Sequence, residues 1–442
     1  VALANANQTI RDRVARLFCD TFRELGATVA TAGGLARALC EDDDGVLTRF
    51  VTSDDARRAC EDLVEYLSTS VDVEHSEHTT RVLASAVANC DAAAQTKFAE
   101  RVFDDARQNP LVSCAVVCGL APDASFDVNR LTNALEALVE FATSEESNAA
   151  SRKFVAAAVG SATHKFPTAT FVPPTGDLGH PATTLIVGAC VRARAMRRDD
   201  APEFKALVSR LFESLDAETP ATARGAAVAL GMAVGFDADA RDVGLGLRAC
   251  THANEKFLSR QRFFATIAPR LTEDAHRAVG VRRLSRAYAA VKLAGGVPAS
   301  VALSPQFKLF ALLPDVLRAL TLGTLARDDD ALRATVLLVG SRLADPALRD
   351  PSDEGEDERL APSLVDALAS IAVASPDDAS MECRESALEV LVAVAALAFS
   401  AVYPCRERAL DAALAACDDP KRRVRRAAAA ARQVWMKITS VR

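Results

Sequence analysis

The chain has 442 residues, half of them hydrophobic but only 5% aromatic, and its formal net charge at pH 7 is −7. This charge and a sequence isoelectric point near 5.6 argue against duplex nucleic acid as the main partner, because phosphate binding needs clustered positive charge. No apolar run approaches the roughly 18 residues of a membrane span, and no signal peptide opens the sequence. The first residue is Val1 rather than Met, so we expect a piece of a longer protein.

Several N-terminal stretches carry apolar residues at helical spacing. Residues 8–25 place one stripe on a single face, formed by Ile10, Val14, Leu17, Phe18 and Phe22. Residues 128–142 and 204–215 repeat the pattern, each followed by a polar break and an Ala-rich segment. Alanine is the best helix former, so the spacing predicts amphipathic helices in pairs.

Residues 163–184 interrupt this pattern. The segment contains four prolines and two glycines, Pro167, Pro173, Pro174, Pro181, Gly176 and Gly179. Proline in a helix interior removes a hydrogen bond and clashes with the preceding turn, so no continuous helix is expected here. We favour a long connection between repeats over a binding loop.

A phrase repeated three times dominates the last third of the chain. It is a proline, five variable residues and leucine, at Pro314–Leu320, Pro362–Leu368 and Pro404–Leu410. The prolines are 48 and 42 residues apart. After each phrase come an Asp-bearing break and a second apolar stretch with an aliphatic or Cys residue next to Arg, namely Leu332-Arg333, Cys383-Arg384 and Val424-Arg425.

A period of about 40–47 residues with two helices per unit is typical of HEAT and armadillo repeats. The sequence therefore predicts an all-α superhelical solenoid, in which each repeat packs only on its neighbours. We expect N-terminal repeats over 1–162, the connection over 163–184, middle repeats over 185–300 and C-terminal repeats over 301–442. Within the last block, 345–360 is rich in Asp and Glu, and we expect a disordered loop because its like charges repel.

The last predicted helix carries most of the candidate binding residues. Asp419 can cap it, Pro420 suits its first position, and Asp418 lies at the positive end of its dipole. At 100° per residue one face collects Val424, Ala427, Ala428, Ala431 and Trp435. Basic residues lie beside that face or point away from it, and they are Lys421, Arg422, Arg425, Arg426 and Arg432.

Two residues of this helix have alternative interpretations. Trp435, the single tryptophan, either closes the end of the core or anchors a partner, and the sequence favours neither. For Arg425 we favour a structural role, in which an Arg bonds an Asp of an adjacent turn and forms a ladder along the solenoid.

These residues resemble one HEAT-repeat family. The similarity lies in Asp418-Asp419-x-Lys421-Arg422-x-Val424-Arg425, followed by Ala431-Arg432-x-x-Trp435. A second stretch, Arg260-Gln261-Arg262-Phe263-Phe264 with Pro269 and Leu271, is similar to the family's internal motif, and Ala162-x-His164-Lys165-x-Pro167 is a weaker third. The family is the one first named for sensitivity to methyl methanesulfonate, the adaptor of the cytosolic iron–sulfur assembly (CIA) targeting complex.

The resemblance implies a non-catalytic scaffold without a cofactor of its own. Members hold a WD40-propeller protein and a MIP18-type protein against their C-terminal repeats, and present apo iron–sulfur clients such as DNA-repair and replication enzymes. We also expect residence in cytoplasm and nucleus. From the lack of a long apolar run and from the negative net charge we expect no membrane and no direct nucleic-acid binding. Members are about twice this length, and the acidic insert and Ala-rich last helix depart from the family pattern.

Other classes of protein have weaker support. An importin-β-like transport receptor is also an acidic HEAT solenoid, and Ran–GTP-dependent cargo release would distinguish it. A phosphatase scaffold would be recognised by its co-purifying subunits. For an enzyme the best residues are His75 and His78, but zinc needs three or four ligands, and we favour a solvated segment. The 11 cysteines form no CxxC pair, so we expect buried thiols in a reducing compartment.

Overall fold

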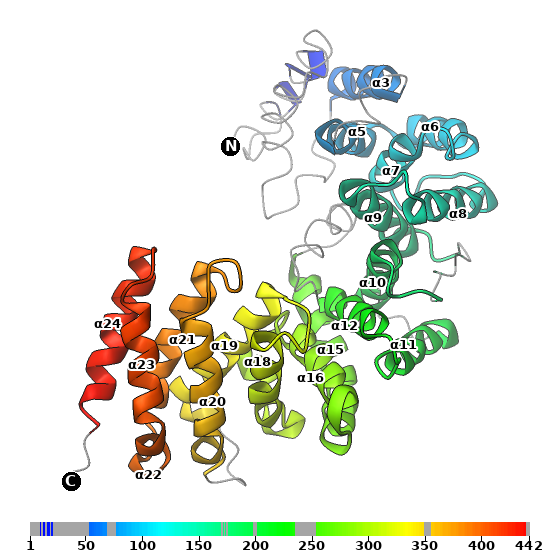
Figure 1. Ribbon diagram of the computed structural model, residues 1–442. Coiled ribbons are helices and arrows are strands. Elements are labelled where there is room, and N and C mark those ends of the chain that lie inside the picture. The colour runs from blue at the N-terminus through cyan, green and yellow to red at the C-terminus, as the bar shows by residue number, and fades with distance from the viewer. Residues whose placement is uncertain are drawn as a thin grey trace. The chain divides into compact units, whose positions relative to one another are not determined.

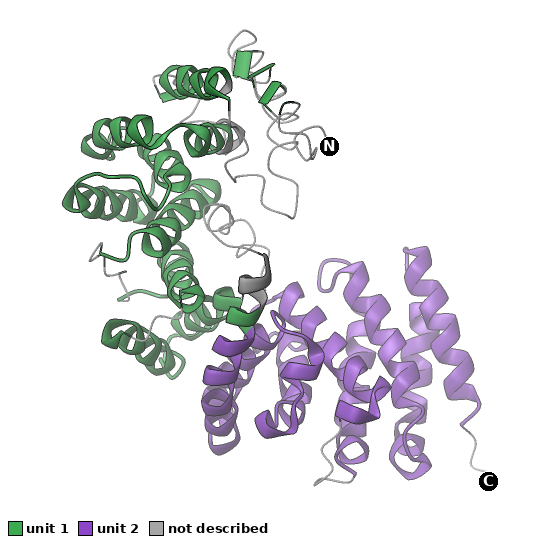
Figure 2. Ribbon diagram, turned by 180° about the vertical axis from the view of Figure 1, so that it is seen from behind, with its two compact units in different colours: residues 1–260 green, residues 261–442 purple. Residues whose placement is uncertain are grey.

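The structure is a computed structural model. It describes residues 53–68, 77–168, 176–197, 201–234, 253–348 and 355–438, together with single residues within 9–20 and at 171 and 173. All regular structure in these ranges is helical, with no β-strand. Backbone contacts divide the chain into two compact units, Val1–Arg260 and Gln261–Arg442 (Figure 2). The predicted repeat-block boundaries at 162, 184 and 300 stay predictions.

The first unit is a stack of helix pairs (Figure 1). Its helices are α3 (Asp54–Ser68), α5 (Glu77–Asn89), α6 (Ala92–Asp104), α7 (Pro110–Gly119), α8 (Val128–Thr143), α9 (Ala149–Lys165), α10 (Pro181–Met196), α11 (Pro202–Ser214) and α12 (Pro220–Val234). Helices α5, α7, α9, α10 and α12 pack in succession, and α6, α8 and α11 cover them from one side. This is the two-layer arrangement of a helical solenoid, and it confirms the predicted fold class.

Helices α7 and α10 of this succession are apolar nearly all round. Every residue of α7 is buried, and thirteen of the sixteen residues of α10 are buried. A helix without a polar face needs covering on all sides, and here the neighbouring helices of the stack cover it. Lys165 and Arg197 then satisfy carbonyls near the C-terminal ends of α7 and α9, through Nζ to Cys118 O at 2.6 Å and Nη1 to Thr163 O at 2.7 Å.

The Pro-rich connection takes the place of one covering helix. The described part of 166–180 contains no helix, and it links α9 to α10, which pack directly against each other. The Leu178 carbonyl accepts the Thr184 hydroxyl at 2.8 Å. That same carbonyl oxygen lies 1.8 Å from where a Cβ on Gly225 of α12 would stand. The described part of the connection is therefore packed onto α12.

The second unit repeats the two-layer stack at higher regularity. Helix α15 (Ala253–Arg277) leads into it, followed by α16 (Gly280–Ala294), α17 (Ala299–Ala302), α18 (Leu313–Thr321), α19 (Asp329–Ala344), α20 (Glu356–Ala372), α21 (Met381–Val394), α22 (Phe399–Val402), α23 (Arg406–Ala416) and α24 (Arg422–Met436). Single 3₁₀ turns at Pro305–Phe307, Phe310–Leu312, Pro346–Leu348 and Tyr403–Cys405 join some of them. Helices α18, α20 and α23 form one layer, and α19, α21 and α24 form the other.

The three proline phrases lie in the layer formed by α18, α20 and α23. Pro314 is in the first turn of α18, and Pro404 lies in the 3₁₀ turn before α23. Pro362 lies inside α20, because that helix begins two turns earlier, at Glu356. The phrase thus recurs once per repeat in the same layer, as the repeat period predicted, but its proline takes a different position in α20 than in α18 and α23.

The acidic segment is only partly the loop that we expected. Residues 349–354 lie outside the described residues, but 356–360 belong to α20. Asp357 is only 4% exposed, and Arg342 of α19 donates to it at 3.1 Å and to Glu356 at 2.5 Å. The prediction failed here because like charges near a helix N-terminus are compensated by a buried Arg from the neighbouring helix and by the helix dipole.

Replacing Gly225 by Ala should destabilise the protein by about 1–3 kcal/mol, because the added methyl group collides with the Leu178 backbone. Gly176→Ala is the matched control, since a Cβ there meets nothing within 4 Å. Urea unfolding of both variants checks this. Equal stability of the two variants would show that the backbone at Leu178 can move away from the added methyl group at no cost in stability.

Candidate protein-binding surface on the last helix pair

Helix α24 begins later than its sequence suggested. Its first helical residue is Arg422 and its N-cap is Lys421, which makes no side-chain capping bond. Asp419 and Pro420 lie in the preceding turn. Asp419 does not cap α24 because its carboxylate is held by Arg384 and by the Lys421 amide, at 2.8 Å and 2.7 Å. The predicted caps are thus wrong in position.

The predicted packing face of α24 is confirmed. Val424, Ala428, Ala431 and Trp435 are all fully buried, and Ala427 is half-buried. This face packs on α21 and α23. Burial of small residues lets the three helix backbones approach closely.

Trp435 closes the core of the last pair. Its side chain is fully buried, and its indole N–H donates to the Leu391 carbonyl of α21 at 3.0 Å. A partner could reach the ring only if α24 separated from α21. Of the two interpretations of Trp435, the structure therefore favours the core residue over the surface anchor.

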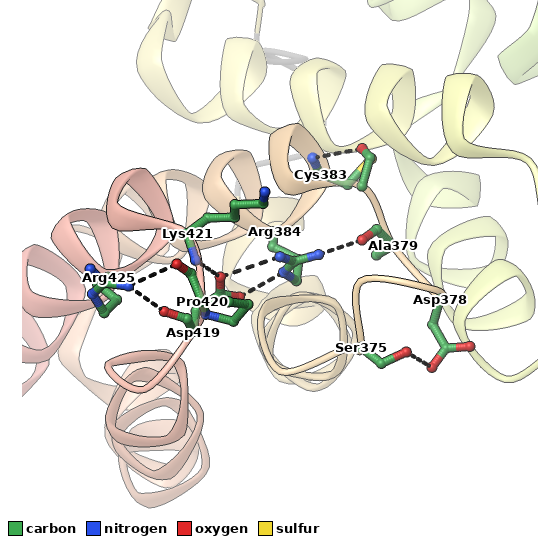
Figure 3. Close-up of polar contacts among 10 residues, drawn as sticks. Ser375, Asp378, Ala379, Cys383, Arg384, Asp419, Pro420, Lys421 and Arg425 are labelled. Atoms are coloured by element: carbon green, nitrogen blue, oxygen red, sulfur yellow. Dashed lines mark hydrogen bonds and ion pairs between the residues drawn. The ribbon is translucent and has the colours of Figure 1, made fainter.

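A buried ion pair joins the last two helix pairs (Figure 3). The Arg384 side chain is 1% exposed and the Asp419 side chain 7%. Nε of Arg384 donates to Asp419 Oδ2 at 2.8 Å and Nη2 to Oδ1 at 3.3 Å, and Nη1 donates to the Ala379 carbonyl at 2.5 Å. This bidentate geometry fixes the turn between α23 and α24 against α21.

An analogous contact joins α16 to α19. Lys292 donates to Asp328 at 2.8 Å, and the Tyr288 hydroxyl donates to the same carboxylate. Asp328 is also the N-cap of α19, accepting the Ala331 amide. Two cation–aspartate contacts thus join repeats of the second unit, Lys292–Asp328 between α16 and α19 and Arg384–Asp419 between α21 and the α23–α24 turn. We call these two contacts the ladder.

Arg333 lies outside this ladder because of its register. It stands five positions after the N-cap Asp328, whereas Arg384 stands four positions after the N-cap Ser380. One residue rotates a side chain by 100°, and Arg333 is exposed. The repeated aliphatic-Arg pair in the sequence is consequently not one structural position.

Both ladder carboxylates have lowered pKa values. Burial by itself raises the pKa of Asp419, but its hydrogen bonds to Arg384 and to the Lys421 amide outweigh this and hold the pKa below its ordinary value. For Asp328 the burial effect is likewise outweighed, chiefly by Lys292, and the pKa is lowered. Both carboxylates are ionised at neutral pH.

The basic residues of α24 form an exposed surface beside this core. Lys421, Arg422, Arg425, Arg426 and Arg432 are all exposed. Arg425 donates to the carbonyls of Asp419 and Pro420 at 2.7 and 3.0 Å, so it closes its own turn and does not pair with an Asp side chain of another repeat. Within the described ranges, Arg422, Arg426 and Arg432 make no ion pair with a carboxylate.

Positive charge at the start of a helix opposes the helix dipole. Arg422 and Arg423 occupy the first two positions of α24, whose first turn has no acidic residue. Arg423, which the sequence patterns did not single out, bonds the nearly buried Glu385 of α21 at 2.7 Å. Arg422 and Arg426 have no such compensation in the described ranges, so their charge is left for solvent or an acidic partner. We call Lys421, Arg422, Arg426 and Arg432 the cationic surface.

The internal motif in α15 is divided between core and surface. Phe263 and Phe264 are buried, and the Phe264 ring meets Phe307 edge-on at 5.0 Å. Arg262 is exposed, whereas Arg260 and Gln261 are half-buried. The aromatic pair thus packs the second unit, and nothing in its geometry marks a binding site.

The residues considered for metal binding are only partly described. His75 lies outside the described residues, and for His78 only the backbone, in α5, is described. No group of three or more His, Cys, Asp or Glu in the described ranges is placed to hold a metal ion. In the same ranges no helix is long and apolar enough to cross a membrane.

Comparison with known proteins identifies the family. A family model described as RNAPII transcription regulator C-terminal (MMS19_C) matches residues 38–395, most of the chain. The chain belongs to the MMS19 family. The match ends before α24, so the family assignment does not depend on the cationic surface.

A curated relative supports this assignment. The MMS19 nucleotide excision repair protein homolog of Arabidopsis thaliana is 31% identical over 192 residues, which are 43% of this chain and 16% of the relative. The match thus spans about one sixth of that relative's length. The family assignment agrees with the resemblance of the sequence motifs.

Two solved structures are similar at low level. The match to an engineered protein covers 98% of this chain and 97% of that protein, with 14% identity and a TM-score of 0.36. The match to importin β covers 99% of this chain and 63% of the importin β chain, with 13% identity and a TM-score of 0.32.

Asp419→Asn should lower the free energy of unfolding at pH 7 by about 3 kcal/mol, because it leaves Arg384 buried without its counter-charge. The native pKa of Asp419 is lowered, so its contribution is fully present above the unfolded value near 3.9 and is lost as the pH falls through the native pKa. Urea unfolding from pH 7 to pH 3 should show the two stability curves converging in acid. A constant difference would contradict this linkage.

Trp435→Phe should cost about 1–3 kcal/mol, because it removes the donor to the buried Leu391 carbonyl while keeping an aromatic ring. Trp435→Ala should cost about 3–5 kcal/mol through the cavity it leaves. Thermal unfolding, followed by circular dichroism, compares the stability of wild type with that of the two variants. If Trp435→Ala were as stable as wild type, the indole would not be a core residue.

Proposed function

We propose that this chain is part of a non-catalytic scaffold of cytosolic iron–sulfur assembly targeting. In this role it brings the cluster-delivery proteins, a WD40-propeller and a MIP18-type protein, to apo iron–sulfur clients such as DNA-repair and replication enzymes. Family membership supports the proposal, and the repair and transcription descriptions of the relatives agree with clients of that kind. We expect the protein to act in cytoplasm and nucleus.

A stack of helix pairs is suited to this task. Each pair contacts only its neighbours, so the stack presents a long surface on which several partners bind at once. Holding donor and client on one scaffold raises their effective concentration without any chemistry by the scaffold itself. The mechanism we propose is therefore proximity.

The observation that carries the docking proposal is the uncompensated charge of Arg422 and Arg426. Both side chains are exposed, and both project from a helix that Trp435 and the Arg384–Asp419 pair hold in place. A rigid helix that displays unpaired cations loses little conformational entropy when an acidic surface binds it. We propose that the cationic surface docks the propeller–MIP18 pair.

Arg422→Glu combined with Arg426→Glu should weaken co-purification of the propeller and MIP18-type proteins at least about tenfold, a loss of roughly 1.4 kcal/mol or more in binding free energy. The loss arises because the two glutamates repel the acidic partner surface that the two arginines attract. Pull-down and isothermal titration in low and high salt measure it, and wild-type binding should weaken as salt rises.

Arg318→Glu is the matched control, since Arg318 is an exposed Arg on α18 in the other layer of the same unit. It should bind as wild type does. Trp435→Ala is kept out of the binding variant, because it would disturb the core and confuse loss of binding with loss of folding. Full binding by the double variant with normal helical content would refute docking on this surface.

A further inference from the structure

Two cysteines of the first unit are in direct contact. Sγ of Cys19 lies 3.9 Å from Sγ of Cys60, with the two residues 41 positions apart in sequence. Their side chains are buried, at 5% and 2% exposure. In the sequence they are isolated cysteines, and only the fold brings them together.

Further contacts hold the same two segments together. The described residues between Thr9 and Asp20 are helical, and Cys60 belongs to α3. Asp12 accepts the Ser53 amide at 3.1 Å, and Arg16 lies 3.7 Å from Asp55. Asp12, Arg16 and Cys19 follow at intervals of four and three residues, so they share one helical face. That face is turned toward α3, which keeps the thiols in register.

A third thiol lies close to these two but bonds elsewhere. Cys90, which directly follows α5, is buried, and its Sγ donates to the Ala86 carbonyl at 3.3 Å. Burial raises the pKa of Cys90, and the hydrogen bond with Cys60, together with burial, raises that of Cys19. These two thiols are therefore protonated and slow to react at neutral pH, and a small neutral oxidant is the kind that can reach them.

We propose that Cys19 and Cys60 form a disulfide when the protein meets a peroxide, and that this bond fastens the helical residues around Cys19 to α3. One thiol gives up its proton and its sulfur attacks the peroxide, breaking the O–O bond to leave a sulfenic acid and one water. The second thiol attacks that sulfenic sulfur, the S–S bond forms, and the hydroxyl group leaves as a second water. In total two thiols lose two protons and two electrons, and one hydrogen peroxide becomes two waters.

The bond closes a long loop between two segments now held by weak contacts. Cross-linking two distant positions restricts the unfolded chain and so favours the folded state. The consequence is a redox-sensitive brace on the N-terminal end of the described stack. This inference is independent of the iron–sulfur role and of the cationic surface, since it involves neither.

The test treats the whole chain with hydrogen peroxide, blocks remaining thiols after denaturation, and identifies linked tryptic peptides by mass spectrometry. Cys19, Cys60 and Cys90 fall in separate peptides, residues 17–23, 59–81 and 82–97. The peptide pair 17–23 with 59–81 should appear with the loss of two hydrogen atoms, and exceed any 59–81 with 82–97 product by about tenfold, because the Cys19 and Cys60 sulfurs are already in contact whereas the Cys90 thiol bonds the Ala86 carbonyl.

Two variants complete the test. Cys60→Ala should remove the linked pair, whereas Cys90→Ala, a substitution of a neighbouring buried thiol, should retain it. The melting temperature of wild type should rise on oxidation and return with dithiothreitol, and that of Cys60→Ala should not rise. Oxidation of the half-exposed Cys417 without a 17–23/59–81 product, or a dominant Cys60–Cys90 bond, would overturn the proposal.

Discussion

The second unit depends on an ion pair that water scarcely reaches. Arg384 and Asp419 each belong to a different repeat, and their bidentate contact is the polar link between α21 and the turn that starts α24. A buried charge is tolerated only when its counter-charge is close and its remaining hydrogen-bonding groups are satisfied. Here the Ala379 carbonyl and the Lys421 amide complete that requirement. The position of α24 is therefore set by electrostatics as well as by its apolar face.

The same link decides what α24 displays. Because Asp419 is occupied by Arg384, it does not cap α24, and the helix starts at Arg422 with basic residues in its first turn. Trp435 faces the core and bonds the Leu391 carbonyl, so the opposite side of the helix is left to the arginines. One buried contact thus gives both a fixed helix and an exposed cationic surface, which is the combination a docking scaffold needs.

The ladder shows how a solenoid tolerates irregular repeats. Lys292 and Asp328 make a similar contact between α16 and α19, two repeats earlier, with Tyr288 as a further donor. Arg342 instead stabilises the start of α20 through Glu356 and Asp357. Each junction has a buried cation, but its residue type and register change. Since every repeat packs only on its neighbours, such changes stay local and the stack continues.

The sequence by itself determined the helical class, the repeat period, and the apolar face of α24, because these follow from spacing along a single chain. It also carried the family resemblance, which the match over 38–395 confirms. It could not determine which of Leu332-Arg333, Cys383-Arg384 and Val424-Arg425 would be equivalent, that Asp357 would be buried, or that Cys19 would meet Cys60. Those outcomes depend on which side chains from distant residues share one interior, where an unpaired charge is costly and a paired one is not. Only the packing of neighbouring helices decides that.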